Sequence, residues 1–257
     1  NTAKSEFLDN LGHEIRRPAN GLDSVVRKLE AGELSPAQRA QTRLLHLATG
    51  SLLKLCDEVL NFSEVDAGGA PVEERTFLLR ELLPRVLAEC GASETVAVHW
   101  PPDFTDGFVG DDTKLGIMVA NLTANALRHA PGAPVEINVS AAPLTDGGAT
   151  VLIEVADGGP GVPADEQEVI FKRFIRGSRA QADRVPGTGI GLAMCRAMAR
   201  LLGGSVGVES PSEIARERGW PGPGATFFVR VPLAQPGPGG VPAPTHPPRR
   251  VKPFSIA

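Results

Sequence analysis

The sequence predicts two fold classes in one chain: an all-α helical hairpin, followed by an α+β two-layer domain. Three observations lead to this prediction. Apolar residues recur at seven-residue intervals in the first quarter of the chain, strand-like alternation takes over after it, and a Pro/Gly-rich stretch without periodicity follows. We therefore expect a helical hairpin over residues 1–69, an α+β domain over residues 70–233, and a linker or tail over residues 234–257.

The hairpin is predicted from two helices that each carry an apolar seam. The first helix has rows at Leu8, Ile15, Leu22 and Leu29 and at Leu11, Pro18 and Val25; the second has rows at Leu45, Leu52 and Val59 and at Ala48, Leu55 and Phe62. Between them, Gly32 can end a helix, Ser35 can cap the next, and Pro36 suits its first turn. A hairpin cannot bury such a seam alone, so we expect a homodimeric four-helix bundle. The alternative is packing onto the rest of the same chain.

The second region alternates like a half-buried sheet. Strand patterns cover "TVAVHW" (95–100), "PVEINVSAA" (134–142), "TVLIEVAD" (150–157), "SVGVES" (205–210) and "TFFVRVPL" (226–233). The segment "LTDGGAT" is typical of a hairpin turn, and helical patterns cover residues 112–130 and 190–203. One sheet backed by helices is the arrangement these elements favour.

Composition excludes several function classes. The 257 residues carry a net charge of −4 and no block of Lys or Arg, which argues against a nucleic-acid partner. The three cysteines lie far apart and fit neither a metal knuckle nor a disulfide framework, so we expect a reducing compartment. No apolar run approaches the ~18 residues of a membrane span. We expect this fragment to be cytoplasmic, whether or not the full-length protein is anchored in a membrane.

Three segments of the second region are candidates for chemistry. In "NLTANALRHA", Asn121, Asn125 and Arg128 share one helix face, which suits a hydrated cation and phosphates; the alternative is a solvated face. In "VADGGPGVP", a strand ends at Asp157 and glycines follow, so a carboxylate can point into a pocket that a flat ligand approaches; the alternative is an ordinary Asp-Gly turn. In "GTGIGL", glycines precede a helix, whose start favours phosphate. This GxGxG pattern is neither a Rossmann GxGxxG nor a P-loop.

The order and spacing of these segments resemble the bacterial sensor histidine kinases. "NLTANALRHA" is similar to their N box, "DGGPG" to the G1 box, "IFKRFIRG" to the F box and "GTGIGL" to the G2 box of the Bergerat-type ATP-binding fold. "KSEFLDNLGHEIRRPANGL" resembles the H box of their dimerisation domain, and "LNFSEVDAGG" the end of its second helix. The resemblance covers roughly residues 3–233.

The resemblance implies an ATP-dependent kinase that uses Mg²⁺ and phosphorylates itself. His13 would accept the γ-phosphoryl group on a ring nitrogen, and Glu14 would take the other ring proton as general base. The phosphoryl group would then pass to an aspartate of a response-regulator receiver domain, either separate or C-terminal to residue 257. A different reading is a catalytically silent, dimerising nucleotide-binding module that regulates a partner kinase. A topoisomerase or chaperone ATPase lacks support, because such proteins place a catalytic Glu where Asn121 stands.

The resemblance also assigns the nucleotide site residue by residue. Asn125 would bind Mg²⁺, with Asn121 one turn earlier; Arg128 stands at the family's usual lysine near the phosphates, and His129 flanks the nucleotide. Asp157 would accept a hydrogen bond from the adenine amino group. The remaining predicted ligands are the wall residues Gly159 and Gly161 and the phosphate-side residues Gly187, Thr188, Gly189, Gly191 and Leu192. Residues 177–186 resemble the mobile lid, and Phe171 and Phe174 either hinge it or pack in the core.

Three positions depart from the family pattern. Arg17 replaces the Thr or Asn that is linked to phosphatase activity, and a guanidinium cannot accept a hydrogen bond from a hydrolytic water. We therefore expect a poor phosphatase. Gly158 stands where Asn is usual, with a small expected effect on Mg²⁺ or adenine contacts, and Lys172 stands where an acidic residue is common. The sequence offers no physical account of Lys172.

Overall fold

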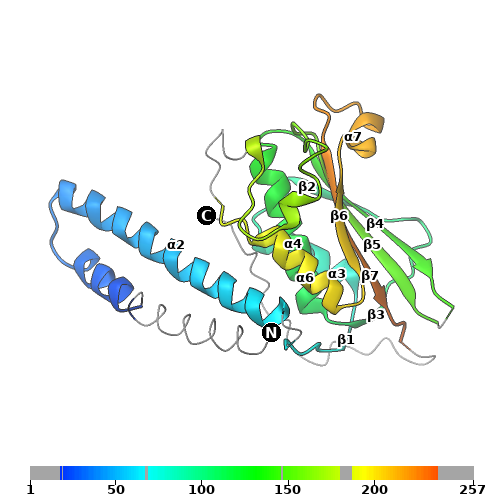
Figure 1. Ribbon diagram of the computed structural model, residues 1–257, viewed down its shortest axis with the longest axis horizontal. Coiled ribbons are helices and arrows are strands. Elements are labelled where there is room, and N and C mark those ends of the chain that lie inside the picture. Colours follow the sequence, from blue (N-terminus) through cyan, green and yellow to red (C-terminus); the bar gives the residue numbers. More distant parts are fainter. Residues whose placement is uncertain (1–17, 19, 67–68, 146, 180–186, 237–257) are drawn as a thin grey trace. The chain divides into compact units, whose positions relative to one another are not determined.

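The computed structural model describes residues 18, 20–66, 69–145, 147–179 and 187–236. Contacts divide the chain into two compact units, residues 1–70 and residues 71–256 (Figure 1). The expectations for His13, Glu14 and Arg17, for most of the lid and for most of the tail lie outside the described residues. Within the described ranges, no helix is both long enough and apolar enough to cross a membrane.

The first unit is the predicted helical hairpin. Residues 20–30 are helical, and after a short connection α2 (Pro36–Asp66) follows. Ser35 and Gln38 form a reciprocal cap at the start of α2: the Ser35 Oγ accepts from the Gln38 backbone N–H at 3.3 Å, and the Ser35 N–H donates to the Gln38 Oε1 at 3.0 Å. The predicted N-cap and the proline in the first turn are therefore both observed. α2 is described as far as Asp66, and residues 67 and 68 lie outside the described residues.

Much of the predicted apolar seam is exposed in the single chain. Five members of the predicted rows, Leu22, Val25, Leu29, Leu45 and Leu52, have between 41% and 55% of their surface accessible. Leu44 and Leu47 of α2 are also exposed. Burial of such side chains is worth about 1.5–3 kcal/mol each, so the hairpin has an apolar surface that a partner can cover. Pairing with a second copy stays a prediction.

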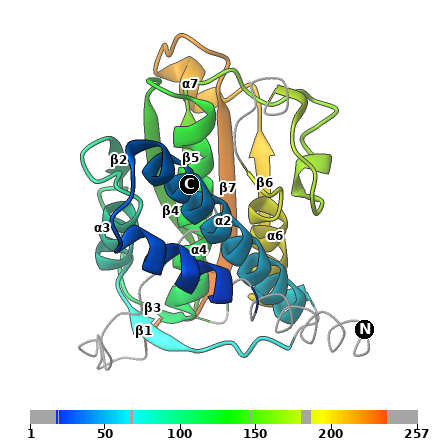
Figure 2. The same cartoon turned by 90° about the vertical axis from the view of Figure 1, so that its left-hand side faces the viewer.

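The second unit contains all five predicted strands in one sheet. Their order is β2-β4-β5-β7-β6, as Figure 2 shows across the sheet. The strands are β2 (Val96–His99), β4 (Val135–Pro143), β5 (Ala149–Asp157), β6 (Ser205–Glu209) and β7 (Ala225–Leu233). β2 pairs with β4 in parallel and the other pairs are antiparallel, including the predicted β4–β5 hairpin. β1 (Arg75–Phe77) and β3 (Phe108–Gly110) form a separate two-stranded antiparallel sheet.

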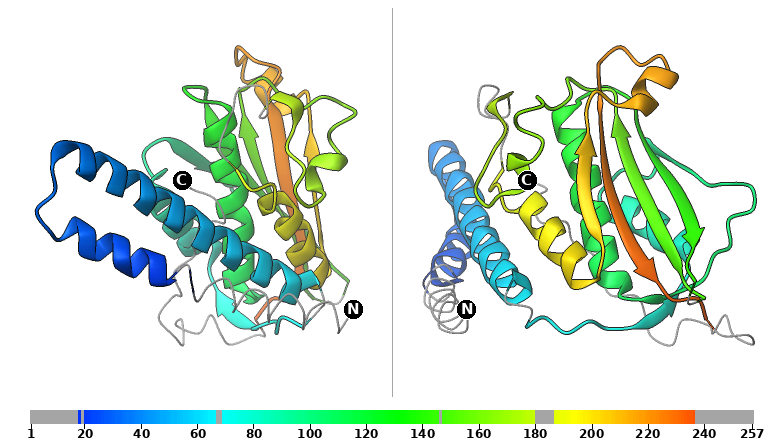
Figure 3. Two further views of the ribbon diagram at one scale, coloured as in Figure 1. Left: turned by 60° about the vertical axis from the view of Figure 1, so that its left-hand side comes forward. Right: turned by 45° about the vertical axis from the view of Figure 1, so that its right-hand side comes forward.

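Three helices cover one face of this sheet: α3 (Leu79–Glu89), α4 (Asp112–His129) and α6 (Gly191–Leu201) (Figure 3). Alternate residues of β5, Val151, Ile153 and Val155, are fully buried beneath them, as period-two alternation requires. Leu115, Met118 and Leu122 of α4 and Met194 of α6 complete the core. The predicted two-layer α+β fold is therefore confirmed, with α4 as the central helix.

Several short elements were not predicted. They are β1, β3, α3, the 3₁₀ turn η1 (Val169–Phe171) and α7 (Glu213–Glu217). α3 carries Pro84 in its interior, and α7 has only five residues, too few to display a period. α7 lies in the β6–β7 connection, on the face of the sheet opposite α4 and α6 (Figures 1 and 3).

Candidate functional site

A cavity of about 470 Å³ opens in the second unit. Its walls come from α4, the end of β5, η1 and the start of α6. Eleven of the residues that the sequence singled out line it: Asn121, Asn125, Arg128, His129, Asp157, Gly161, Gly187, Thr188, Gly189, Gly191 and Leu192. Gly159 does not line the cavity; a Cβ there would lie 2.7 Å from the Ala130 Cβ, so this residue packs against the end of α4. The structure thus brings all three candidate segments to one cavity.

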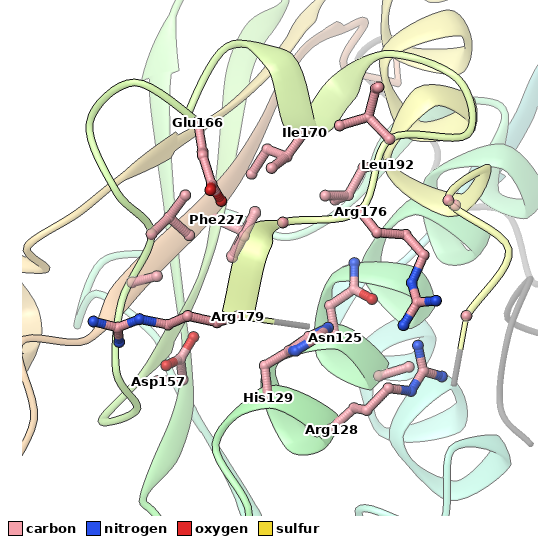
Figure 4. A pocket seen from close by; sticks show the side chains of 18 of the residues that line it. Asn125, Arg128, His129, Asp157, Glu166, Ile170, Arg176, Arg179, Leu192 and Phe227 are labelled. Carbon is pink, nitrogen blue, oxygen red and sulfur yellow. The ribbon is translucent and has the colours of Figure 1, made fainter. Parts of the chain in front are cut away.

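The α4 wall carries the two amides and the two basic residues. Asn121 is 4% exposed and donates to the Ile117 carbonyl at 3.0 Å, while its Oδ1 lies close to Gly191 at the start of α6. Asn125 is one turn later and points into the cavity (Figure 4). Burial, with further contributions from Arg128 and Arg176, lowers the pKa of His129 below its usual range. This imidazole is therefore neutral at pH 7.

Asp157 supplies a buried carboxylate at the far side of the cavity. It is 5% exposed, and its Oδ1 accepts from the Gly159 N–H at 2.9 Å. Burial raises the pKa of Asp157 to about 6, although backbone N–H groups of Gly159 and Ala225 partly oppose the shift. At pH 7 the group is mostly ionised, and it is a strong acceptor for a donor that enters the cavity.

The glycines of the third motif allow the chain to run close to the preceding loop. Gly189 has φ +73°, and a Cβ there would lie 2.9–3.0 Å from backbone atoms of Phe174 and Ile175. The Phe174 N–H also donates to the Gly189 carbonyl at 3.0 Å. α6 begins directly afterwards, at Gly191. Because the first N–H groups of a helix have no partner within it, this end of the cavity is suited to phosphate.

Sequence reasoning missed three charged residues of the cavity wall: Glu166, Arg176 and Arg179. The Arg179 Nη1 donates to the Pro160 carbonyl at 2.6 Å, and Glu166 accepts from the Ser178 N–H at 3.1 and 3.2 Å. Figure 4 shows Asp157 and Arg179 at one side, Arg128 and Arg176 at the other, and Asn125 between them. A signal existed, since "FIRGSRA" brings two arginines to the segment before the glycine motif.

The charge arrangement fits a ligand that donates hydrogen bonds at one end and is anionic at the other. Mg²⁺ takes few protein ligands and keeps most of its waters. In the part of the chain that is described, no group of three or more His, Cys, Asp and Glu side chains could hold a metal. The Asn125 amide lies inside the cavity near two arginines. It could therefore supply one oxygen ligand to a Mg²⁺ ion whose other ligands are mainly waters and the phosphates of a bound ligand.

Two further expectations concern the F-box segment. Phe171 is 4% exposed, with its ring centroid 6.4 Å from that of Phe227, so it packs in the core. Phe174 is 63% exposed and has φ +60°. Whether it acts as a hinge stays a prediction. Lys172 is exposed, and nothing in the structure explains a lysine there.

Comparison with known proteins relates both units to one family. Residues 110–235 match the model described as "Histidine kinase-, DNA gyrase B-, and HSP90-like ATPase". The chain is 34% identical to the sensor histidine kinase AruS of Pseudomonas aeruginosa over 237 residues, and 28% identical to the signal transduction histidine-protein kinase BarA of Escherichia coli K12 over 235. Each alignment covers 90% of this chain but only 23% and 25% of the relative, so the chain spans about a quarter of these relatives.

A solved structure supports the same assignment. The crystal structure of full-length ShkA in complex with AMPPNP matches with a TM-score of 0.72 and 28% identity, over 90% of this chain and 46% of that one. The Acinetobacter baumannii histidine kinase AdeS matches with a TM-score of 0.53 at 16% identity, which supports the fold alone. The match to ShkA extends over most of the chain, including residues before the sheet.

Proposed function

Because the chain belongs to the sensor histidine kinases of two-component signalling, we propose that it transfers the γ-phosphoryl group of ATP to His13 and from there to an aspartate of a receiver domain. Residues 1–69 act as the dimerisation and phosphotransfer hairpin, residues 70–233 bind ATP, and residues 234–257 form a linker. The single observation that supports this function best is the cavity, which has a buried carboxylate at one side and two arginines at the other.

The base end of ATP lies at Asp157 in this proposal. The adenine amino group donates to the carboxylate, and Gly161 forms part of the wall beside the base. A Cβ at Gly161 would lie 2.6 Å from the Ser210 Oγ, so glycine is needed there for contact with the β6–β7 connection. Gly159 holds the carboxylate by its N–H, at 2.9 Å from the Oδ1. A carboxylate accepts from an amino group but cannot donate to the carbonyl that guanine carries at the same position, so this end selects ATP over GTP.

The phosphate end lies between α4 and α6. Arg128 and Arg176 neutralise phosphate charge, with neutral His129 beside them. The N–H groups of Gly187, Gly189, Gly191 and Leu192 and the Thr188 hydroxyl surround the phosphates. Asn125, with Asn121 one turn earlier on α4, would hold Mg²⁺, which would supply positive charge to neutralise the phosphates. In phosphoryl transfer the protein positions the groups and stabilises charge, and this wall supplies side chains for both tasks.

The transfer step forms a bond between a His13 ring nitrogen and the γ-phosphorus while the bond from that phosphorus to the β-phosphate oxygen breaks. ADP leaves with the electron pair of that bond. Glu14 accepts the proton of the other ring nitrogen, so the phosphorylated ring does not carry an extra positive charge. The exposed leucine rows of the hairpin support a homodimer through a four-helix bundle.

Incubation with γ-labelled ATP and Mg²⁺ tests the function. We expect label that is stable in base and lost in acid, and mass spectrometry of material never exposed to acid should locate it on the His13 ring. Transfer of the label to a receiver domain should follow. Full occupancy of the cavity by nucleotide with an unmodified His13 would instead indicate a silent module that regulates a partner kinase.

Arg17 gives a separate prediction about the reverse activity. The wild type is expected to dephosphorylate its receiver partner slowly, because a guanidinium cannot orient water as an acceptor. Arg17→Thr is expected to raise that rate about a hundredfold, the lower end of the 10²–10⁴ range of general acid–base effects, without changing phosphorylation of His13. The release of labelled phosphate from the phosphorylated receiver measures it. Rapid release by the wild type would contradict the prediction.

A further inference from the structure

The connection between β6 and β7 lies in direct backbone contact with the turn that follows Asp157. In this connection, residues 210–224, the Gly224 N–H donates to the Gly159 carbonyl at 2.9 Å. A Cβ at Gly222 would lie 2.3 and 2.4 Å from the carbonyl oxygens of Gly159 and Gly158. The connection therefore forms the back wall of the turn whose other side faces the cavity.

One hydroxyl ties the connection to the turn. The Ser210 Oγ accepts from the Val162 N–H at 2.8 Å and donates to the Gly224 carbonyl, also at 2.8 Å. The Gln167 amide spans the same two segments, because its Nε2 donates to the Ser210 carbonyl at 2.7 Å and to the Val162 carbonyl at 3.2 Å. Loss of the Ser210 hydroxyl would leave an N–H and a carbonyl of the two segments without this link.

Trp220 occupies the space beside Gly158. A Cβ added to Gly158 would lie 3.3 Å from the Trp220 Cβ and Cε3 and from the Pro134 Cδ. This crowding gives a physical reason for glycine at a position where the family usually has Asn. The indole takes up space that an asparagine side chain would need.

The connection is itself anchored to the sheet. Ser212 caps α7 and its hydroxyl lies 2.7 Å from that of Thr226, with both residues almost fully buried. The Arg218 Nε donates to both carboxylate oxygens of the buried Glu136 on β4, at 3.2 Å each. Because the connection is fixed to both β7 and β4, it can hold the turn after Asp157 in a defined position.

We propose that residues 210–224 are a nucleotide-positioning element in which Ser210 and Trp220 are positioning residues that set the affinity for the base. The inference rests on the proposed ATP site. Among the described residues, the connection contacts the turn at the base side of that site, while α4 and α6 build the phosphate side. Disturbing it should therefore weaken nucleotide binding without slowing the transfer step.

The tryptophans make this testable by fluorescence. The chain has two tryptophans and no tyrosine. The other tryptophan, Trp100, packs against Phe104 with 5.0 Å between ring centroids, and the Arg80 Cζ lies 4.8 Å from the Trp100 ring centroid. In Trp100→Phe, titration with ADP should change the Trp220 emission. In the matched Trp220→Phe variant, where Trp100 alone emits, ADP should leave the emission unchanged. Unchanged Trp220 emission while calorimetry records ADP binding would overturn the proposal.

Ser210→Ala tests the positioning role by separating affinity from rate. We expect the ADP dissociation constant and the KM for ATP to rise about fivefold, as loss of a hydrogen-bonded link implies, with kcat for His13 phosphorylation within about twofold. Ser210→Thr, which keeps the hydroxyl, should restore most of the affinity. Arg216→Ala removes only an exposed ion pair of α7 with Glu213 and should match the wild type.

The outcomes separate this inference from the function on which it rests. A wild-type protein that binds no ADP contradicts the ATP site itself. Normal wild-type binding together with unchanged affinity in Ser210→Ala contradicts only the positioning role. A fall in kcat with unchanged KM would also contradict it, because that pattern indicates a role in the transfer step.

Discussion

His13→Gln is expected to abolish the acid-labile label from γ-labelled ATP while ADP affinity stays within about twofold of the wild type. Glutamine has a similar length but no nucleophilic ring nitrogen, so no N–P bond can form. Every described wall residue of the nucleotide cavity comes from residues 121–227, so the substitution removes none of them. Autoradiography after base treatment, beside calorimetry with ADP, measures the two effects separately.

His46 provides the matched control for this variant. It lies in α2 of the same helical unit, where its Nδ1 is 3.3 Å from a Glu30 carboxylate oxygen. His46→Gln therefore changes a histidine of the hairpin that has a local surface partner and no proposed part in the transfer. We expect it to keep full labelling. Label retained in His13→Gln, or lost in His46→Gln, would contradict the assignment of the acceptor.

The strands and central helices could be predicted because burial imposes a period on them. β5 alternates between buried and less buried residues along most of its length, and this alternation is visible in "TVLIEVAD". The five-residue α7 has no such signal, since its position depends on the Ser212 cap and on the ion pair between Arg218 and Glu136. The cap joins residues three positions apart and gives no periodic signal. The ion pair joins residues that are distant in sequence, so periodicity could not reveal it.

The cavity residues also divide into those that local sequence patterns predict and those whose positions depend on contacts between distant parts of the chain. Its glycines and amides could be predicted, because glycine spacing and a four-residue repeat on a helix are local properties. The position of Arg176 depends on the loop that Gly189 contacts and on the positive φ of Phe174, which no motif specifies. The reason for Gly158 was missed for a related cause, since Trp220 lies 62 positions later and meets it only in the folded chain.

Asp157→Asn is expected to weaken ADP binding at pH 8 by about tenfold to a hundredfold, the range for a lost charge-assisted hydrogen bond. The Gly159 N–H lies 2.9 Å from the Oδ1 and would select the amide oxygen of the asparagine. The remaining amide NH₂ would then face the adenine amino group, donor against donor. The affinity for GDP should change little, because guanine carries a carbonyl and not an amino group at that position. Calorimetry with both nucleotides measures the change.

The pH dependence gives this variant a second, sharper signature. Because burial raises the pKa of Asp157 to about 6, the wild type should lose ADP affinity as pH falls through 6, whereas an aspartate near its usual value of 3.8 would stay ionised at pH 5. The ADP affinity of Asp157→Asn lacks this step, so the wild type and the variant should have similar ADP affinities near pH 5. Titration of the nucleotide phosphates is common to both and cancels in the comparison.

Asp157→Asn, which weakens ADP binding at pH 8, should make the nucleotide-free protein more stable at the same pH. A folded-state pKa above the unfolded value means that the native state binds the proton more tightly, so this group favours folding below pH 4 and loses that contribution as pH rises through 6. Asp157→Asn removes the buried charge and should raise the free energy of unfolding at pH 8, measured by urea denaturation without nucleotide. A variant that is both less stable and weaker in binding would indicate that Asp157 supports the fold rather than the ligand.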